Sequence, residues 1–373
     1  MTLTATDDYL GHQTAAPYAQ AGMADTKHAI FTERFWYMGT IAPAGDTVFG
    51  FGLGYYPNRG VMDCYAALTV DGMQYNFRAS RSTANRPLSS GAGPLEFQIV
   101  EGMREHRILL RPNESGLSMD LRFLSDRQLH DEGRETRHRG DELLSDVTRF
   151  VQTGAYAGTI TLNGKTIAVS PETCWGARDR SWGLRVEARS DESHPPVSRF
   201  PPIFYAFLCA HFPDHSLHFF FKENPDGSYR LFCGDEVGRQ GGAKPRRIVA
   251  LEHDIAWAKD DFGQHAERGV FRLTYEDCTK KDLPFTAKPG RLYLKGGLYG
   301  GLRGWFQGDP RGELYTEHNA WSFANAADRR EARTLAEQVL EIRDGDAVGY
   351  GTLQSGVAEG YSKYKEIQHL PPM

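Results

Sequence analysis

The fold is indicated most clearly by residues 159–169, which read TITLNGKTIAV. Two runs rich in β-branched residues flank Asn163-Gly164, and an Asn-Gly pair readily adopts the positive φ angles of a two-residue hairpin turn. Residues 65–78, YAALTVDGMQYNFR, repeat this pattern around Asp71-Gly72. The second arm of this stretch alternates polar and apolar residues, as does a strand with one wet and one packed face. Both stretches predict antiparallel hairpins.

Short apolar runs separated by glycine or polar turns continue through most of the chain. We expect further strands in both halves, at residues 35–38, 47–51, 97–100, 107–110, 117–123, 204–209, 217–222, 229–233, 249–256, 268–275, 291–294, 339–342 and 347–352. A short helix is expected to begin at Ala326, where alanine, arginine and glutamate dominate. No long amphipathic helix alternates with the strands, which argues against Rossmann and TIM folds. The pattern predicts an all-β protein of antiparallel barrels or sandwiches.

The length of 373 residues exceeds one ordinary hydrophobic core and suits two domains. Residues 1–25 are polar and rich in alanine, so we expect a flexible N-terminal tail there. The segment Ser190–Pro202 is rich in proline and polar residues, which is typical of a linker. We therefore expect one barrel over residues 26–189 and a second over residues 203–373.

Composition narrows the class of function. The chain is 40% hydrophobic and 24% charged, which is typical of a globular protein. Its net charge of -5 carries no basic signature, so nucleic acid is not an expected partner. Five cysteines without a CxxC pair favour neither a zinc ribbon nor a disulfide framework, and they suit a reducing cytoplasm. No stretch resembles a signal peptide or an integral membrane segment.

The densest group of reactive side chains lies in residues 174–185, CWGARDRSWGLR. Arg178 and Arg180 flank Asp179, and cationic neighbours favour an ionised carboxylate that can accept a proton or stabilise a cation. Burial against Trp175 or Trp182 would instead raise the carboxyl pKa and suit a general acid. A purely structural Arg–Asp ion-pair cluster is the third reading. The residues alone leave all three open.

Several short motifs in this region resemble one known superfamily. They are DVT at 146–148, QTGAYAG at 152–158, Gly164, and RDRSWG at 178–183. Together they are similar to the hydroxyneurosporene synthase superfamily, also described as AttH-like. The resemblance implies two tandem lipocalin-like (calycin) barrels, as in the related tocopherol cyclases. It also implies a hydrophobic terpenoid or aromatic small molecule as substrate, with acid/base or shape-based catalysis and no redox cofactor.

The resemblance covers about residues 146–185 at the level of motifs. Carotenoid hydratases of this superfamily carry an acidic residue followed by a Trp-Gly pair, which corresponds here to Asp179, Trp182 and Gly183. The arginines and the serine between them depart from the hydratase pattern and resemble a sister branch. The departure concerns the reaction and leaves the implied fold unchanged.

Other residues offer weaker candidates. Glu317 and His318 could supply a second acid/base pair from the other barrel, or simply end a surface strand. Tyr299 lies in the glycine run 296–301, where the backbone can approach a ligand closely, and Tyr65 is a further pocket candidate. The alternative reading for each is ordinary core packing.

A metal site is not expected. His211, His215 and His218 lie close in sequence, but Pro213-Asp214 predicts a turn between strands that would scatter the three rings. The charged stretch 126–142 is expected to be a solvated loop, with a lid over a pocket mouth as the alternative.

The chain has no GxSxG, HExxH or phosphate-loop motif, so common hydrolases and nucleotide enzymes lack support. We expect a cofactor-independent lyase, hydratase, isomerase or cyclase in which Asp179 acts catalytically while Arg178, Trp175 and Trp182 shape the pocket. A non-catalytic carrier or sensor of a hydrophobic ligand is the alternative, and a solid interaction module is a third possibility. Exposed strand edges make a homodimer plausible.

Overall fold

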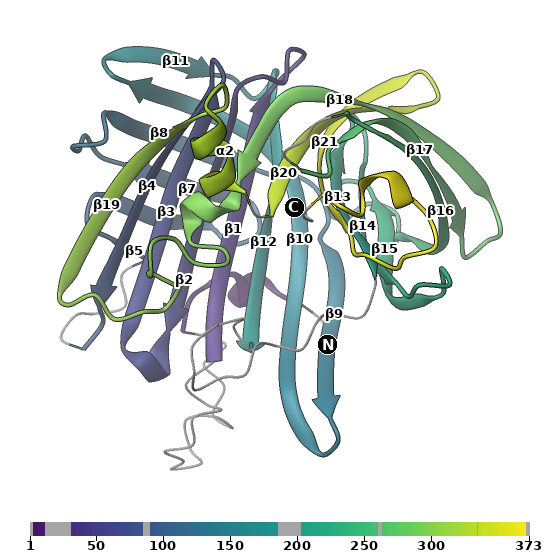
Figure 1. Ribbon diagram of the computed structural model, residues 1–373, viewed down its shortest axis with the longest axis horizontal. Coiled ribbons are helices and arrows are strands. Elements are labelled where there is room, and N and C mark those ends of the chain that lie inside the picture. The colour runs from purple at the N-terminus through teal and green to yellow at the C-terminus, as the bar shows by residue number, and fades with distance from the viewer. Residues whose placement is uncertain are drawn as a thin grey trace.

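The computed structural model describes residues 3–11, 31–84, 90–185, 203–259, 263–333 and 335–370. Two antiparallel sheets lie side by side, with the first sheet on the left of Figure 1 and a closed barrel on the right. Strands account for most of the described chain. The prediction of an all-β protein built from two barrel-like sheets is confirmed.

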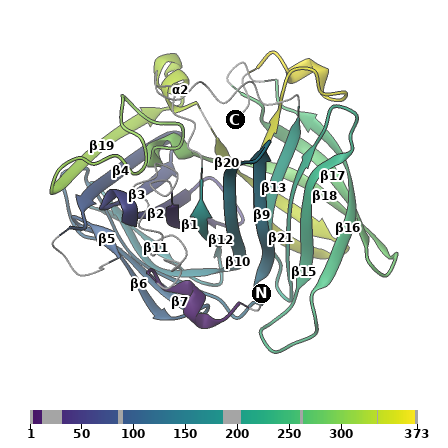
Figure 2. The same cartoon turned by 90° about the horizontal axis from the view of Figure 1, so that it is seen from below.

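The first sheet contains thirteen strands and curls into an incompletely closed barrel (Figure 2). Its path runs through β19 (Leu314–Ser322), β4 (Met73–Ser82), β3 (Val61–Val70), β2 (Val48–Tyr56), β1 (Phe31–Ile41), β12 (Cys174–Leu184), β10 (Glu142–Leu162), β8 (Leu117–Leu124), β7 (Glu105–Leu110), β6 (Leu95–Glu101) and β5 (Gly91–Ala92). Two further strands, β9 (His130–Arg139) and β11 (Lys165–Val169), pair with the long strand β10.

The second sheet is a closed barrel of eight strands. They are β13 (Phe204–His211), β14 (Ser216–Glu223), β15 (Tyr229–Val237), β16 (Arg246–Trp257), β17 (Ala266–Tyr275), β18 (Lys280–Tyr293), β20 (Ala336–Asp344) and β21 (Ala347–Val357). Pairing of β21 with β13 closes the barrel.

Helices are short. Within the described ranges, four are 3-10 turns, η1 (Ala5–Asp8), η3 (Pro57–Arg59), η4 (Leu294–Gly297) and η5 (Lys365–Ile367). The helix expected from Ala326 is α2 (Ala326–Ala332), whose N-cap Asn325 accepts hydrogen bonds from two backbone amides of the first turn. Among the described residues, no helix has the length and apolar character needed to cross a membrane.

The two predicted hairpins are confirmed. Asp71 and Gly72 have φ angles of 52° and 70°, and Asn163 and Gly164 have φ angles of 49° and 80°. Positive φ at both central residues is the mirror-image turn that matches the twist of paired strands. Each turn therefore joins neighbouring strands, β3 to β4 and β10 to β11.

Side chains fill both sheet interiors. Phe49, Phe51 and other apolar residues pack inside the first sheet, and Phe219 and Phe271 belong to the matching cluster inside the second. A third cluster, which includes Trp36 and Phe207, joins the outer faces of the two sheets. The two halves therefore pack against each other through their outer faces.

The second half of the chain returns to the first sheet. After β18, the chain passes through η4 and forms β19, which pairs with β4 along residues 73–81. This covers an edge that β4 would otherwise expose. The expected linker, Ser190–Pro202, lies outside the described residues, so the domain boundary there stays a prediction.

Part of the expected N-terminal tail is built into the first sheet. Asp8 is fully buried, and its carboxylate accepts hydrogen bonds from Arg178 at 2.6 and 2.9 Å. The expectation of a loose tail is therefore wrong for residues 3–11, because a buried arginine on β12 needs this carboxylate. Residues 12–25 lie outside the described part of the chain.

Candidate active site

A cavity of about 580 Å³ lies between the outer faces of the two sheets. Strands β1, β9, β10 and β12 line it from the first sheet, β13, β14 and β21 line it from the closed barrel, and the loop after η4 completes the wall. Aromatic side chains form much of its wall, namely Trp36, Tyr205, Phe207, Phe220, Tyr299 and Phe306. Its size and largely apolar wall suit a small organic ligand.

Alternation along β12 decides which side chains reach this cavity. Asp179 and Ser181 point outward from the first sheet and line it. Arg178 and Arg180 point to the opposite face, because successive strand residues alternate between faces. Arg178 pairs there with Asp8, and Arg180 pairs with Glu33. The structure therefore separates Arg178 from the cavity and makes it a buried structural cation.

Asp179 is the acid/base candidate that the structure does place at the cavity. Its side chain is 18% exposed, and Arg149 Nε lies 3.7 Å from Asp179 Oδ2. Burial raises the pKa of Asp179 above its ordinary value, while the guanidinium groups of Arg149 and Arg185 act in the opposite direction. A carboxyl group whose pKa is raised is a stronger base when ionised, so Asp179 can exchange a proton with a molecule bound beside it.

Basic side chains outnumber acidic ones around the cavity. The lining includes five basic residues, Arg34, Arg137, Arg149, Arg185 and Lys222, and two acidic ones, Glu135 and Asp179. Burial, reinforced by Arg34 and Arg149, lowers the pKa of Arg185 to about 9. Arg185 Nη2 donates to Ser181 Oγ at 2.7 Å, and its buried Nε has no hydrogen-bond partner among the described residues. The cavity is therefore suited to a ligand that carries, or develops, negative charge.

Glu337, which the sequence did not single out, lies just behind the cavity wall. It is fully buried on β20, and Gln354, a lining residue, donates a hydrogen bond to its Oε1. Burial raises the pKa of Glu337 to about 8. No sequence signal marks it, because β20 reads as an ordinary strand and the burial of this glutamate arises only when the two sheets meet.

Tyr299 lines the cavity, and the ring of Tyr65 packs against the ring of Tyr299. The two rings meet edge to face at 6.2 Å. A Cβ at Gly297 would lie 2.5 Å from the Tyr65 ring, so the glycine run is needed for close packing on β3. The expected close approach is thus to another part of the protein. Tyr65 itself lines a smaller hollow with Arg34 and Tyr299.

The remaining sequence candidates lie away from the cavity. Trp175 packs against His211 and Tyr350 between the sheets, and Trp182 packs with Phe150 at the end of the first sheet. Glu317 on β19 pairs with Arg78, and its neighbour His318 is exposed. Trp182 faces the interior of the first sheet from β12, whereas Glu317 and His318 lie on β19, the strand that pairs with the edge of β4.

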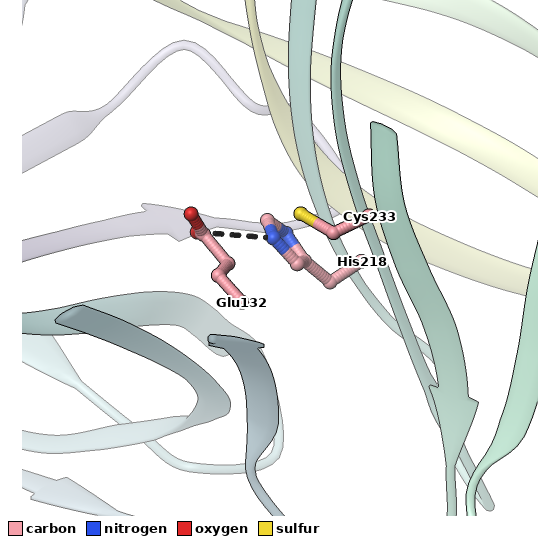
Figure 3. Close-up of side chains that lie close together, drawn as sticks. All are labelled: Glu132, His218 and Cys233. Carbon is pink, nitrogen blue, oxygen red and sulfur yellow. Dashed lines mark ion pairs between the residues drawn. The ribbon is translucent and has the colours of Figure 1, made fainter. Parts of the chain in front are cut away.

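The three histidines considered as metal ligands are scattered, as the turn predicted. His218 lies beside Glu132 and Cys233, and Figure 3 shows the three side chains converging from three strands. His215 lies instead near Glu236 and Asp344. The ammonium group of Lys281 already contacts both of those carboxylates at 2.6 Å, so this second group holds a cation of its own.

The charged stretch 126–142 is not a solvated loop. Residues 130–139 form β9, which pairs with β10 and contributes Glu135 and Arg137 to the cavity wall. This strand was not predicted because its charged side chains lie at the cavity wall or in solvent rather than in an apolar core. Arg149 on β10 likewise joins β9 to the site, pairing with Glu132 at 2.9 Å.

Comparison with known proteins found one matching family and solved structures with a similar fold. Residues 3–363 match a family of unknown function (DUF8625). A Nitrosomonas europaea protein described as a candidate AttH is 13% identical with a TM-score of 0.56, covering 95% of this chain and 99% of that one. Kievitone hydratase from Nectria haematococca is 11% identical with a TM-score of 0.50, covering 88% and 89%. No curated protein matches the sequence. The resemblance to AttH-like tandem barrels is confirmed at the level of the fold.

Proposed function

The chain belongs to a family of unknown function (DUF8625), and from its cavity we propose an acid/base lyase that adds water to, or removes it from, a small organic molecule. The observation that carries this proposal is the carboxyl group of Asp179, raised in pKa by burial, on the wall of an aromatic cavity. A similar fold occurs in kievitone hydratase, and this supports the same reaction class.

The charge of the cavity favours one kind of substrate. Five basic residues line it, and they would oppose a carbocation, the intermediate expected for hydration of an isolated alkene. The same groups would stabilise an enolate, the intermediate for an alkene conjugated to a carbonyl group. We therefore favour an aromatic, carbonyl-conjugated substrate over a terpenoid polyene.

The proposed step needs only water as a co-reactant. The water oxygen bonds to the β-carbon of the conjugated alkene, and the electron pair of the double bond moves to the carbonyl oxygen as an enolate. Arg149 and Arg185, whose charges lower the pKa of Asp179, are the cations that could stabilise this oxygen. Asp179 delivers its proton to the α-carbon, and the proton released from water restores the carboxyl group. Elimination is the reverse sequence.

The proposal is tested by offering the enzyme a panel of hydroxylated and unsaturated aromatic ketones. Gain or loss of one water is followed by mass spectrometry. Asp179→Asn keeps the shape and removes the transferable proton, so turnover should fall about 100-fold or more while ligand binding persists. Glu317→Gln, which removes a carboxylate outside the cavity, is the matched control and should retain activity.

Two outcomes would contradict the proposal. Saturable binding with no chemical change in any ligand would favour a carrier of aromatic compounds. Turnover that survives Asp179→Asn would show that the proton comes from another group.

A further inference from the structure

A group of three side chains, of which His218 is buried and Glu132 and Cys233 are partly buried, lies beside the cavity on the outer face of the closed barrel. Glu132 comes from β9, His218 from β14 and Cys233 from β15 (Figure 3). One donor atom from each lies within 4.8 Å of the other two. His218 is 1% exposed and the side chain of Glu132 is 7% exposed. None of the reasoning about the proposed reaction uses this group.

The hydrogen bonds of His218 fix which nitrogen faces the glutamate. His218 Nδ1 lies 2.8 Å from the carbonyl oxygen of Leu208, which can only accept, so this nitrogen carries a proton. A backbone carbonyl on one ring nitrogen is the usual partner of a metal-binding imidazole, because it leaves the lone pair on the other nitrogen. Here that other nitrogen is Nε2.

His218 Nε2 and Glu132 Oε1 approach to 3.2 Å, yet neither atom has a hydrogen-bond partner of acceptable geometry within the described chain. A neutral imidazole would direct its lone pair at a carboxylate oxygen, which is unfavourable unless a cation lies between them. Two ligands about 2.1 Å from a tetrahedral zinc ion lie roughly 3.4 Å apart. The observed separation is close to that value.

A β-bulge directs Glu132 toward this point. Arg149 of β10 pairs with Gly133, the next residue Phe150 pairs with Asp131, and Glu132 is the extra residue between them. Gly133 has a φ of 74°, which is typical of a bulge that contains glycine. The second oxygen of the carboxylate receives a hydrogen bond from Arg149 at 2.9 Å, as is common for carboxylates that bind metal.

There is also room for a further ligand. A void of about 20 Å³, enough for a water molecule, is lined by Glu132, Cys233, Arg149, Glu135 and four uncharged residues, Gly133, Val147, Phe220 and Leu231. One thiolate, one imidazole and one carboxylate with a water form a donor set that zinc accepts in tetrahedral geometry.

We propose that Glu132, His218 and Cys233 form a zinc-binding site between β9 and the closed barrel. The thiol loses its proton when the metal binds, His218 coordinates through Nε2, and Glu132 coordinates through the oxygen that faces it. The ion would tie the bulged strand of the first sheet to the second barrel. The proposal is independent of the proposed reaction, because it requires no substrate.

The test uses the full chain, first stripped with a chelator and then titrated with Zn²⁺ against a chromophoric chelator. Co²⁺ serves as the spectroscopic probe, since a cobalt–thiolate bond gives a charge-transfer band in the near ultraviolet. We expect a single ion per chain and a sulfur-to-cobalt band. Cys233→Ser should abolish the band, and His218→Gln should weaken zinc binding about tenfold or more.

Matched controls come from the same residue types elsewhere. Cys278 is exposed and His215 lies in the group held by Lys281, so Cys278→Ser and His215→Gln should bind zinc as the wild type does. Zinc should also raise the melting temperature of the wild type but not of Cys233→Ser. Absence of saturable binding would overturn the proposal and identify the cluster as an imidazolium–carboxylate pair. Equal binding by wild type and Cys233→Ser would also overturn it and identify the binding as adventitious.

Discussion

At the scale of single residues, alternation along β12 explains the roles of one short motif. Arg178 and Arg180 point to the inner face of the first sheet, where Arg178 pairs with Asp8 and Arg180 pairs with Glu33. Asp179 faces the cavity. The sequence identified the motif, and the alternation of side chains along a strand explains why both arginines share one face. It could not show that their partners come from η1 and β1, because those contacts join residues far apart in the chain.

Arg178 is expected to act on stability rather than on ligand binding. Arg178→Leu leaves the carboxylate of Asp8 buried without its cation, which should cost about 3–5 kcal/mol of unfolding free energy. Chemical denaturation would measure this loss, and adding Asp8→Asn should restore part of it. A variant of unchanged stability that no longer binds ligand would instead make Arg178 a binding residue.

Glu337 should make stability depend on pH. Its folded pKa of about 8 lies above the ordinary 4.5, so the folded state holds the proton more tightly than the unfolded state. Its contribution is therefore fully present below pH 4.5 and is lost as the pH rises toward 8, by up to about 1.4 kcal/mol per pH unit.

Glu337→Gln removes this titration. Melting temperatures recorded across that range should decline less steeply with pH for the variant than for the wild type. Parallel curves for the two proteins would show that Glu337 is ionised in the folded state throughout.

At the scale of elements, the sequence predicted the hairpin turns but not the charged strand β9. The hairpins at Asp71-Gly72 and Asn163-Gly164 follow from residues that tolerate positive φ, which is a local property. Strand β9 is specified by its pairing with β10 and by its polar neighbours, so its sequence resembles a surface loop. The bulge at Glu132 could not be predicted either, because it is defined by the register between β9 and β10.

The bulge itself can be tested through Gly133. An added Cβ would meet nothing within 4 Å, so Gly133→Ala should cost only the strain of positive φ, about 1 kcal/mol. If the bulge aims Glu132 at the proposed metal, zinc affinity should also fall. Gly164→Ala, with φ of 80° and equally open surroundings, should cost similar stability without changing zinc affinity. Equal zinc affinity in both variants would separate the bulge from the site.

At the scale of the whole molecule, the two barrels are joined more closely than a linker implies. Strand β19 completes the edge of the first sheet, and the cluster containing Trp36, Phe207 and Val339 joins the two outer faces. The sequence predicted two barrels but not a cavity between them. Such a cavity depends on how two finished surfaces meet, and no local pattern encodes that.

This packing predicts cooperative unfolding. Calorimetry should show a single transition for the full chain, because separating the sheets would expose the shared cluster and release β19 from β4. Val339→Asp, in the shared cluster, should lower the melting temperature of the whole protein. Two well-resolved transitions in the wild type would show that the barrels are independent domains, as the sequence alone suggests.

The central claim is that Asp179 moves a proton to and from a molecule held between the two sheets. Proton transfer can be observed directly by NMR, as deuterium incorporation from D₂O at the α-carbon of a bound aromatic ketone. The wild type should catalyse this exchange, and Asp179→Asn should slow it about 100-fold or more while binding the ketone with similar affinity. Exchange at the wild-type rate in Asp179→Asn would contradict the account.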